Sequence, residues 1–276
     1  MSFYPQPNKY SCGPFALKYA LVMLGIFRHE KEIAEVAGSN WWSGTDEIGL
    51  ARAAKKFNCK MNYFHSEDPD KAFALLDGQL DKGLPCILSV NNWEHWLTVL
   101  GCQHDKYIIV DSGLERVIAI LNPSKLLKRW KYQDEKDLSF DGYSIQPGSK
   151  VATKAVFTLE KARIVMYKRN EPLAKKWDTY FNDLIYICRP RNSNDINFIP
   201  VNDFLKHYGK MLIKRVSFWH GAPGVKELNR ILKNMQFVAE VYDLVIYKED
   251  ENRALVDMTS LLMMYTCGKY GMQPIY

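Results

Sequence analysis

The apolar positions of the chain follow two different spacings in its first half. Up to about residue 81 they recur every three to four residues, which predicts helices because one helical turn contains 3.6 residues. From residue 86 onward they form short β-rich runs separated by turn residues, which predicts strands. The predicted helices are residues 12–27, 31–37, 45–57 and 69–81, with a strand at 60–64, and the later strands are 86–90, 96–101, 107–110 and 117–120. Helices followed by an antiparallel sheet indicate an α+β fold.

A polar, turn-rich stretch then predicts a division of the chain. Residues 131–152 include the turn sequence Gln146-Pro147-Gly148-Ser149, and glycine and proline side by side are typical of turns. We therefore predict a first domain at residues 1–130, a linker or crossover at 131–152, and a second domain at 153–276. In the second domain the predicted strands are residues 183–188, 211–219 and 236–247, and the predicted helices are 224–234 and 253–266. This alternation predicts a small α/β region of unknown type.

The composition is that of a soluble globular protein, and its mild positive charge favours a solvated surface over a nucleic-acid or membrane partner. The chain has 276 residues, of which 47% are hydrophobic and 25% charged. Lysine and arginine outnumber the acidic residues by 37 to 31, giving a net charge of +6 without a basic tail. Residues 1–7 lack the basic and apolar regions of a signal peptide, and no apolar stretch reaches the length of a membrane span. We expect a cytoplasmic protein with no membrane span and no nucleic-acid partner.

The cysteines do not form a metal-binding or redox motif. Six cysteines are scattered along the chain, and no two of them form a Cys-x-x-Cys pair. A zinc ribbon or a dithiol redox site is therefore not predicted. Cys86 and Cys102 lie in apolar, strand-like segments, which indicates buried thiols. The sequence predicts no metal and no organic cofactor.

One cysteine stands where a reactive thiol would be expected. Cys12 directly precedes an apolar helical run, and a helix N-terminus lowers a thiol pKa through its dipole. His95, between two tryptophans at a strand start, is a candidate general base, and Asp111, at a strand end, is a candidate acceptor for the His95 Nδ1–H. Gln6 is a candidate side-chain donor to an oxyanion, with the Cys12 backbone N–H as the second donor. Each residue alone has a plainer interpretation in packing or turns, but the four together in this order favour a cysteine protease.

These residues also give the chain a resemblance to a known family. The pieces that carry it are Gln6, Cys12-Gly13-Pro14 with Ala16-Leu17, Gly44-Thr45-Asp46-Glu47-Ile48, Lys82-Gly83-Leu84-Pro85-Cys86-Ile87, His95 with Val99-Leu100-Gly101, and Asp111. Over residues 4–121 the chain resembles the C39-like cysteine peptidases, a papain-like group that includes the leader-cleaving domains of bacteriocin exporters. The resemblance implies a papain-like N-terminal domain. It also implies Cys12 as nucleophile, His95 as base and acid, Asp111 as the residue that orients the imidazole, and Gln6 as oxyanion donor.

The sequence leaves several functions open. The favoured one is hydrolysis of a peptide or protein substrate through an acyl-enzyme. The same residues would serve a transpeptidase or acyltransferase that passes the acyl group to an amine. A non-catalytic binding or regulatory protein on a papain-like scaffold is the alternative from another class. The role of residues 153–276, the substrate and the oligomeric state are not predicted.

Overall fold

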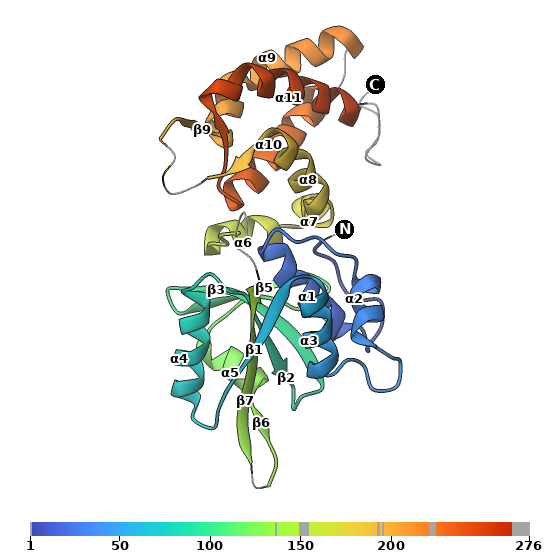
Figure 1. Cartoon of the computed structure of the whole chain (residues 1–276), viewed down its shortest axis with the longest axis vertical. Helices are drawn as coiled ribbons and strands as arrows, with labels where there is room; N and C mark the ends of the chain where they lie inside the picture. Colours follow the sequence, from blue (N-terminus) through green and yellow to red (C-terminus); the bar gives the residue numbers. More distant parts are fainter. Residues whose placement is uncertain are drawn as a thin grey trace. The chain divides into compact units, whose positions relative to one another are not determined.

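The computed structural model describes residues 2–135, 137–148, 155–191, 194, 196–220 and 225–266, with the side chains of residues 219 and 220 left out. The chain divides into two compact units, Met1–Lys175 and Lys176–Tyr276 (Figure 1). Each unit has its own helices and its own small or large sheet, and each is described separately below. Among the described residues, no helix combines the length and the apolar character that crossing a bilayer requires.

The helices of the first unit begin where capping residues predict them. Asp46 accepts the Gly49 N–H at the start of α3, and Asp68 accepts two N–H groups at the start of α4. These side chains satisfy N–H groups that have no partner inside the helix. The helices are α1 (Cys12–Met23), α2 (Glu30–Ala37), α3 (Glu47–Lys56), α4 (Pro69–Leu80), α5 (Pro123–Trp130), α6 (Leu159–Met166), η1 (Lys168–Asn170) and α7 (Glu171–Lys175).

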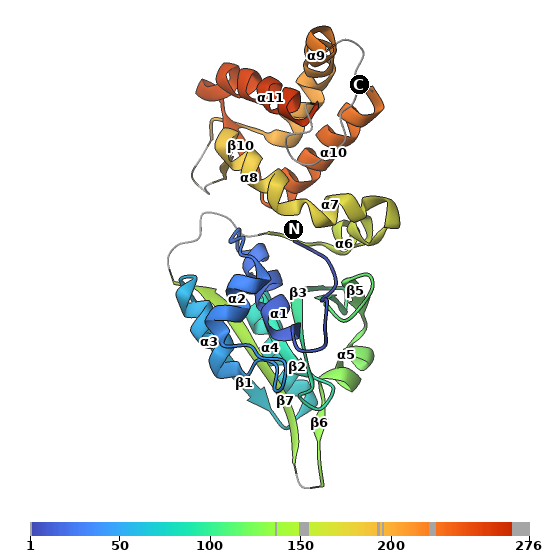
Figure 2. The ribbon, with the colours of Figure 1, turned by 90° about the vertical axis from the view of Figure 1, so that its right-hand side faces the viewer.

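A seven-stranded antiparallel sheet forms the centre of this unit (Figure 2). Its strands are β1 (Cys59–Ser66), β2 (Cys86–Val90), β3 (His95–Gln103), β4 (Lys106–Val110), β5 (Ile118–Leu121), β6 (Tyr132–Gln133) and β7 (Leu138–Pro147). The order is β1-β7-β2-β3-β4-β5, and β6 pairs with β7. Because side chains alternate between the two faces of a strand, Ile87 packs with α1–α3 while Leu88 packs with α4 and α5. The α+β prediction is confirmed for this unit.

The predicted linker at residues 131–152 is wrong over β7. Within Leu138–Pro147, residues 140–147 pair with all of β1, and Cys86↔Ser144 to Leu88↔Gly142 join β7 to β2. This segment looked like a turn because it contains glycine and a proline, yet Gly142 is needed inside the sheet. A Cβ on Gly142 would lie 2.3 Å from the ring of Phe64 on β1. The first unit thus extends to Lys175, and residues 149–154 of the predicted linker lie outside the described residues.

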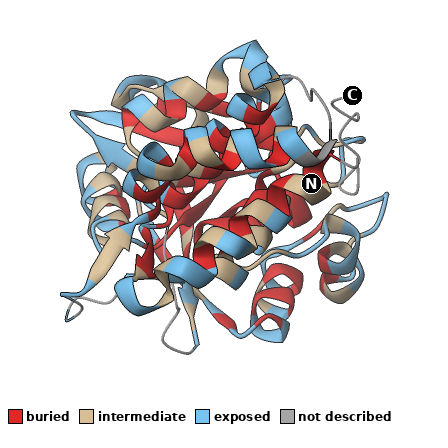
Figure 3. Ribbon diagram, turned by 90° about the horizontal axis from the view of Figure 1, so that it is seen from above, coloured by how far each residue is buried: buried red, intermediate tan, exposed pale blue. Residues whose placement is uncertain are grey.

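The second unit is mainly helical. Its elements are α8 (Trp177–Ile187), β8 (Arg189–Pro190), β9 (Phe198–Pro200), α9 (Val201–His220), α10 (Val225–Val241), β10 (Leu244–Tyr247), η2 (Lys248–Asp250) and α11 (Glu251–Thr266). The three strands form a small antiparallel sheet in the order β8-β10-β9. On the helices, buried residues follow one side and exposed residues the other, as the red and pale-blue bands show (Figure 3).

Two strand predictions in this unit are wrong, and a third is right only at its end. Residues 183–188 belong to α8 except for the last residue, and residues 211–219 lie inside α9. Of residues 236–247, only the last four form β10. A short run of β-branched and aromatic residues cannot be distinguished from a buried helix face by its periodicity. The predicted helices at 224–234 and 253–266 correspond to α10 and α11.

Candidate active site

Cys12 is the first residue of α1 and is 5% exposed. The N-cap residue Ser11 makes no side-chain hydrogen bond to the helix, so the first backbone N–H groups keep their capacity to bind another acceptor. Pro14 lies in the first turn, where its missing N–H costs no intrahelical hydrogen bond. The thiol therefore sits at the positive end of the helix dipole, beside backbone donors that an anion can use.

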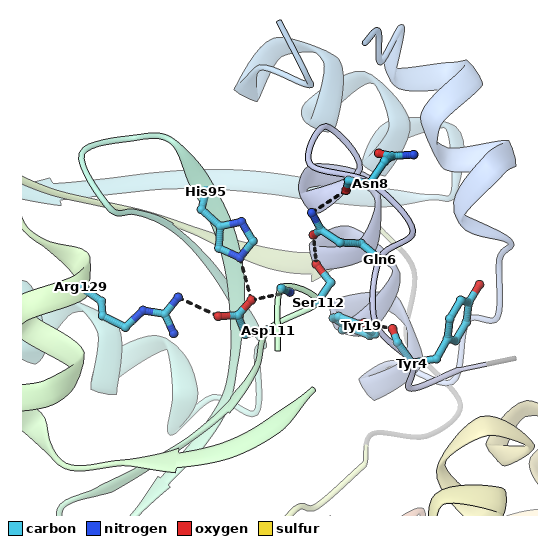
Figure 4. Close-up of polar contacts among 9 residues, drawn as sticks. Tyr4, Gln6, Asn8, Tyr19, His95, Asp111, Ser112 and Arg129 are labelled. Carbon is cyan, nitrogen blue, oxygen red and sulfur yellow. Dashed lines mark hydrogen bonds and ion pairs between the residues drawn. The ribbon is translucent and has the colours of Figure 1, made fainter. Parts of the chain in front are cut away.

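His95 and Asp111 are brought together by two neighbouring strands. His95 begins β3, Asp111 directly follows β4, and the two strands pair antiparallel with Thr98 opposite Val110. His95 Nε2 lies 2.7 Å from Asp111 Oδ1 (Figure 4). The prediction that Asp111 accepts the Nδ1–H is wrong, because the bonded nitrogen is Nε2. With Nε2–H donated to the carboxylate, Nδ1 is left to interact with the thiol.

The Asp111 carboxylate is buried, and both of its oxygens accept hydrogen bonds. Arg129 Nη2, from the last turn of α5, lies 2.7 Å from Oδ2 (Figure 4). The Gly113 N–H donates to Oδ1 at 2.8 Å. Burial would raise the Asp111 pKa, but the bonds from His95, Arg129 and Gly113 outweigh it and lower the pKa to about 2. The carboxylate therefore stays ionised at any ordinary pH. Sequence reasoning missed Arg129, since nothing in the local pattern of α5 marks one basic residue among several.

The imidazole of His95 is held in its charged form by its neighbours. Burial would lower its pKa, but hydrogen bonding to Asp111 and to Cys12, together with their charges, raises the pKa to about 9. The thiol of Cys12 is therefore close enough to His95 to affect its pKa. The three predicted residues thus interact electrostatically: Cys12 on α1, His95 on β3 and Asp111 after β4.

Gln6 is tied to the residue that follows Asp111. Its backbone N–H donates to the Ser112 carbonyl at 2.9 Å, and its side-chain Oε1 accepts the Ser112 hydroxyl (Figure 4). Its Nε2 donates to the Asn8 carbonyl at 2.7 Å. An amide nitrogen carries two hydrogens, so one remains for a further acceptor. The structure therefore fixes Gln6 beside the His95–Asp111 pair in an orientation that keeps one donor.

The segment that carries Gln6 is anchored to α1 by a buried polar cluster. The Tyr19 hydroxyl donates to the Tyr4 carbonyl at 2.6 Å (Figure 4). Lys18, which is 2% exposed, lies 2.8 Å from Glu30 and 3.0 Å from the Tyr4 hydroxyl, and Tyr4 also bonds Glu30. A lysine is almost never buried unless it is paired. This cluster holds the N-terminal segment in register with the start of α1.

A cavity of about 590 Å³ lies in the same unit. It is lined by Ser43, Thr45, Asp46, Glu47, Tyr63, Ser89, Trp93, Trp96, Asp141 and Tyr143. Trp96 follows His95 in the chain, packs in the same core cluster as Cys12, and donates its indole N–H to the Thr45 carbonyl at 3.0 Å. Within the described residues, no group of three or more potential metal ligands is found. The pair Trp41-Trp42, on the loop before α3, is 71% and 82% exposed.

Comparison with known proteins shows which family the first half of the chain is similar to. Residues 1–133, just under half of the chain, match the family model described as Peptidase C39 family. This match confirms the resemblance predicted from the sequence and identifies the matched part as a cysteine peptidase. No curated protein matches the chain.

Several solved peptidase domains are similar in structure to about half of the chain. The peptidase domain of Streptococcus ComA, a bifunctional ABC transporter, is 20% identical, with coverage of 53% of this chain and 98% of that domain and a TM-score of 0.42. A double glycine motif protease from an AMS/PCAT transporter is 16% identical, covering 52% and 90%, also at a TM-score of 0.42. The peptidase C39 like domain of a toxin secretion ATP-binding protein from Vibrio parahaemolyticus is 12% identical, covering 51% and 99%, at 0.38.

Proposed function

We propose that this cysteine peptidase hydrolyses a peptide bond through Cys12, His95 and Asp111, with Gln6 as an oxyanion donor. The observation that carries the proposal is the 2.7 Å contact of His95 Nε2 with the buried Asp111 carboxylate. It leaves Nδ1 for the thiol and holds the imidazole in a single orientation. The position of Cys12 at the start of α1 and the family match support the same assignment.

The reaction proceeds in two stages. His95 carries on Nδ1 the proton given up by Cys12, and the thiolate attacks the substrate carbonyl to give a tetrahedral oxyanion. The second Gln6 Nε2–H and the Cys12 backbone N–H stabilise that oxyanion. The C–N bond then breaks, the amine leaves with the proton from His95, and a thioester remains on Cys12. Water, deprotonated by His95, attacks the thioester and releases the acid.

Asp111 stays ionised throughout and stabilises the imidazolium. Its pKa of about 2 lies far below that of His95, at about 9, so no proton moves onto the carboxylate. The same thioester can pass to an amine in place of water, which would make the enzyme an acyltransferase. Product analysis with an added amine acceptor distinguishes the two outcomes.

Selective alkylation of Cys12 tests the proposal. Iodoacetamide labelling between pH 4 and 9, followed by peptide mass spectrometry, should label Cys12 faster than Cys59, Cys86 or Cys188 at neutral pH. Those three thiols are buried and their pKa values are raised by burial, Cys59 to about 11 and Cys188 to about 12. His95→Ala should shift Cys12 labelling to higher pH, and Cys12→Ala should abolish peptide hydrolysis while keeping the fold.

The control variant is His104→Ala, which removes an imidazole from the turn between β3 and β4. Its Cys12 profile should equal that of the unsubstituted chain. Labelling of Cys12 at the rate of Cys59, Cys86 and Cys188, or a profile that His95→Ala leaves unchanged, would contradict the assignment.

A further inference from the structure

The 590 Å³ cavity described above shares a wall with the proposed nucleophile. Thr45 accepts the indole N–H of Trp96, and a Cβ on Gly13 would lie 2.9 Å from the Thr45 Cβ. Gly13 follows Cys12 and Trp96 follows His95. A peptide bond presented to Cys12 would therefore place neighbouring residues of the substrate in or beside this cavity. Its volume lies in the range of sites that hold a small ligand or a few residues.

Two carboxylates line the cavity, and neither forms an ion pair with a described residue, although His65 lies opposite Asp141 in the pairing of β1 with β7. Asp141 is 6% exposed, and its carboxylate accepts hydrogen bonds from Tyr63, Trp93 and Ser139, all of which are neutral. Glu47, on the first turn of α3, lines the same cavity. Across the part of the chain that is described, no lysine, arginine or histidine nitrogen lies within 4.0 Å of the Asp141 or Glu47 carboxylates.

The tyrosines of the cavity respond to this charge. Burial raises the pKa of Tyr143 to about 12, and the charges of Glu47 and Asp141 add to the effect. The pKa of Tyr63 is raised by burial first and then by the hydrogen bond and charge of Asp141. Both carboxylates therefore act on the same small space.

A hydroxyl group on β2 also faces the cavity. Ser89 lies on β2 opposite Trp96, so both side chains point from the same face of the sheet toward the cavity. Ser89 is 4% exposed, and it lines the cavity. The hydroxyl can accept a hydrogen bond from a donor placed in the cavity.

Rigid aromatic side chains form the remaining walls. Trp93 stacks on Tyr132 at 3.8 Å between ring centroids and donates its indole N–H to Asp141 at 2.9 Å. Tyr63 packs against Tyr143 at 5.2 Å. Aromatic faces attract cations. Acidic groups, a hydroxyl and aromatic faces together suit a cationic side chain with an aliphatic stem.

We propose that this cavity is a substrate subsite that binds a lysine or arginine side chain of the peptide to be cleaved. The inference rests on the proposed function for the placement of the peptide, and on Asp141, Glu47, Ser89 and the aromatic walls for its chemistry. The net charge of the chain is +6. A preference for a cationic side chain therefore comes from the cavity itself and not from the field of the whole molecule.

Binding of defined peptide pools to the Cys12→Ala chain tests the subsite without requiring catalysis. The probes are fluorescein-labelled pentapeptide amides whose central residue is fixed as Lys, Arg, Leu or Glu, with mixtures elsewhere, measured by fluorescence polarisation. The Lys and Arg pools should bind about fivefold more tightly than the Leu pool, the factor that corresponds to an ion pair of about 1 kcal/mol. Adding Glu47→Gln or Asp141→Asn should reduce the preference.

The matched control is Glu32→Gln, which also removes an exposed carboxylate from the first turn of a helix but outside the cavity. It should leave the preference for Lys and Arg unchanged. Equal binding of the Leu and Lys pools, or a preference that survives both Glu47→Gln and Asp141→Asn, would overturn the subsite.

Cleavage of the same pools by the unsubstituted chain separates the two proposals. A cationic preference in binding without any Cys12-dependent cleavage would contradict the proposed hydrolysis and support the subsite. Cys12-dependent cleavage without a cationic preference in binding would contradict the subsite alone.

Discussion

The charge of Asp111 is shared between two cations, and only one of them belongs to the proposed triad. Arg129 and His95 each bond one oxygen of the carboxylate at 2.7 Å. Since Asp111 is 1% exposed, its ionised form depends on these partners. Arg129 is therefore a positioning residue, which acts on the imidazole through the carboxylate.

Replacing Arg129 should raise the pH at which the site is lost on acidification. The pKa of Asp111 is lowered to about 2, so the stability it contributes is present above its unfolded pKa of about 3.9 and is lost as pH falls toward 2. In Arg129→Gln we expect a loss of about 3 kcal/mol at pH 7. Acid unfolding and the fall in Cys12 alkylation should both begin at higher pH.

The control is Lys128→Gln, on the same helix with an exposed side chain. It should match the unsubstituted chain in thermal melts and in the pH profile of alkylation. An Arg129→Gln profile identical to that of Lys128→Gln would mean that the guanidinium does not support Asp111.

The candidate residues could be predicted from sequence, but their bonding could not. Cys12, Gln6, His95 and Asp111 have local signals: a helix start, a preceding loop, a strand start and a strand end. Which ring nitrogen of His95 meets Asp111 depends on the register of β3 and β4, and the assignment to Nδ1 was wrong. Arg129 reaches Asp111 because of where α5 packs on the sheet, and no local pattern encodes that position.

At the scale of single elements, α1 is held in place by a buried ion pair. Lys18 contacts Glu30 of α2 at 2.8 Å, and the Glu30 side chain is 14% exposed. Burial would raise the Glu30 pKa, but Lys18 and Tyr4 lower it to about 2. The pair joins two helices and the segment that carries Gln6.

Lys18→Met should destabilise the first unit by about 3 kcal/mol at pH 7, because it leaves Glu30 buried without its cation. Because its pKa is lowered, ionised Glu30 contributes to the free energy of unfolding above about pH 4.3, and this contribution is lost as pH falls through 2. Urea unfolding at pH 7 and pH 2.5 should therefore show a smaller difference between variant and unsubstituted chain at the lower pH. Lys31→Met, at an exposed position of α2, is the control. A stability difference between Lys18→Met and the unsubstituted chain that does not depend on pH would contradict this role of Glu30 ionisation.

The centre of β7 requires a residue without a side chain. In Gly142→Ala the new methyl would meet the Phe64 ring at 2.3 Å and Leu88 at 2.9 Å. We expect a loss of about 1–3 kcal/mol from overpacking, measured by urea unfolding. Gly78→Ala in α4 is the matched control, because a Cβ there has nothing within 4 Å and a helix favours alanine by about 0.5–1 kcal/mol. Equal effects of the two substitutions would contradict this account.

Elements with a complete local signal were predicted, and those defined by distant partners were not. Strands β2 to β5 are apolar runs between turn residues, and the sequence predicted all four. β7 combines buried and half-buried residues with Gly142, and it becomes a strand through its partners β1 and β2. In α8 and α9 one face, which includes Leu184 and Val216, packs in a helical core, whereas Tyr186 and Phe218 are each 81% exposed. Tertiary packing of the buried face overrides the strand propensity of these segments.

At the scale of the whole molecule, the first unit ends beyond the residues that match the family. The match covers residues 1–133, whereas β7 and the helices up to Lys175 complete the unit. Because β7 lies between β1 and β2, its removal would leave β1 with no strand to pair with. The unit that can fold is therefore longer than the matched segment.

Two truncations test this boundary. The piece 1–175 should unfold cooperatively and keep His95-dependent alkylation of Cys12, because it contains every strand of its sheet. The piece 1–137, which ends just before β7, should lose both properties. Thermal melts by circular dichroism and the alkylation assay report them. A folded, reactive 1–137 piece would show that β7 is dispensable, and an unfolded 1–175 piece would show that the unit needs residues 176–276.

The position of β7 in the sequence also determines when the sheet can be completed during translation. It is the last strand of its sheet along the chain, roughly 135 residues after Cys12. At about 5–20 residues per second, a ribosome needs on the order of ten seconds to cover that distance. During this interval the thiol has been made, but β1 and β2 still lack the strand that joins them, and their open edges can pair with other chains. The nascent chain is therefore most exposed to aggregation, and least able to cleave, until translation has passed Pro147.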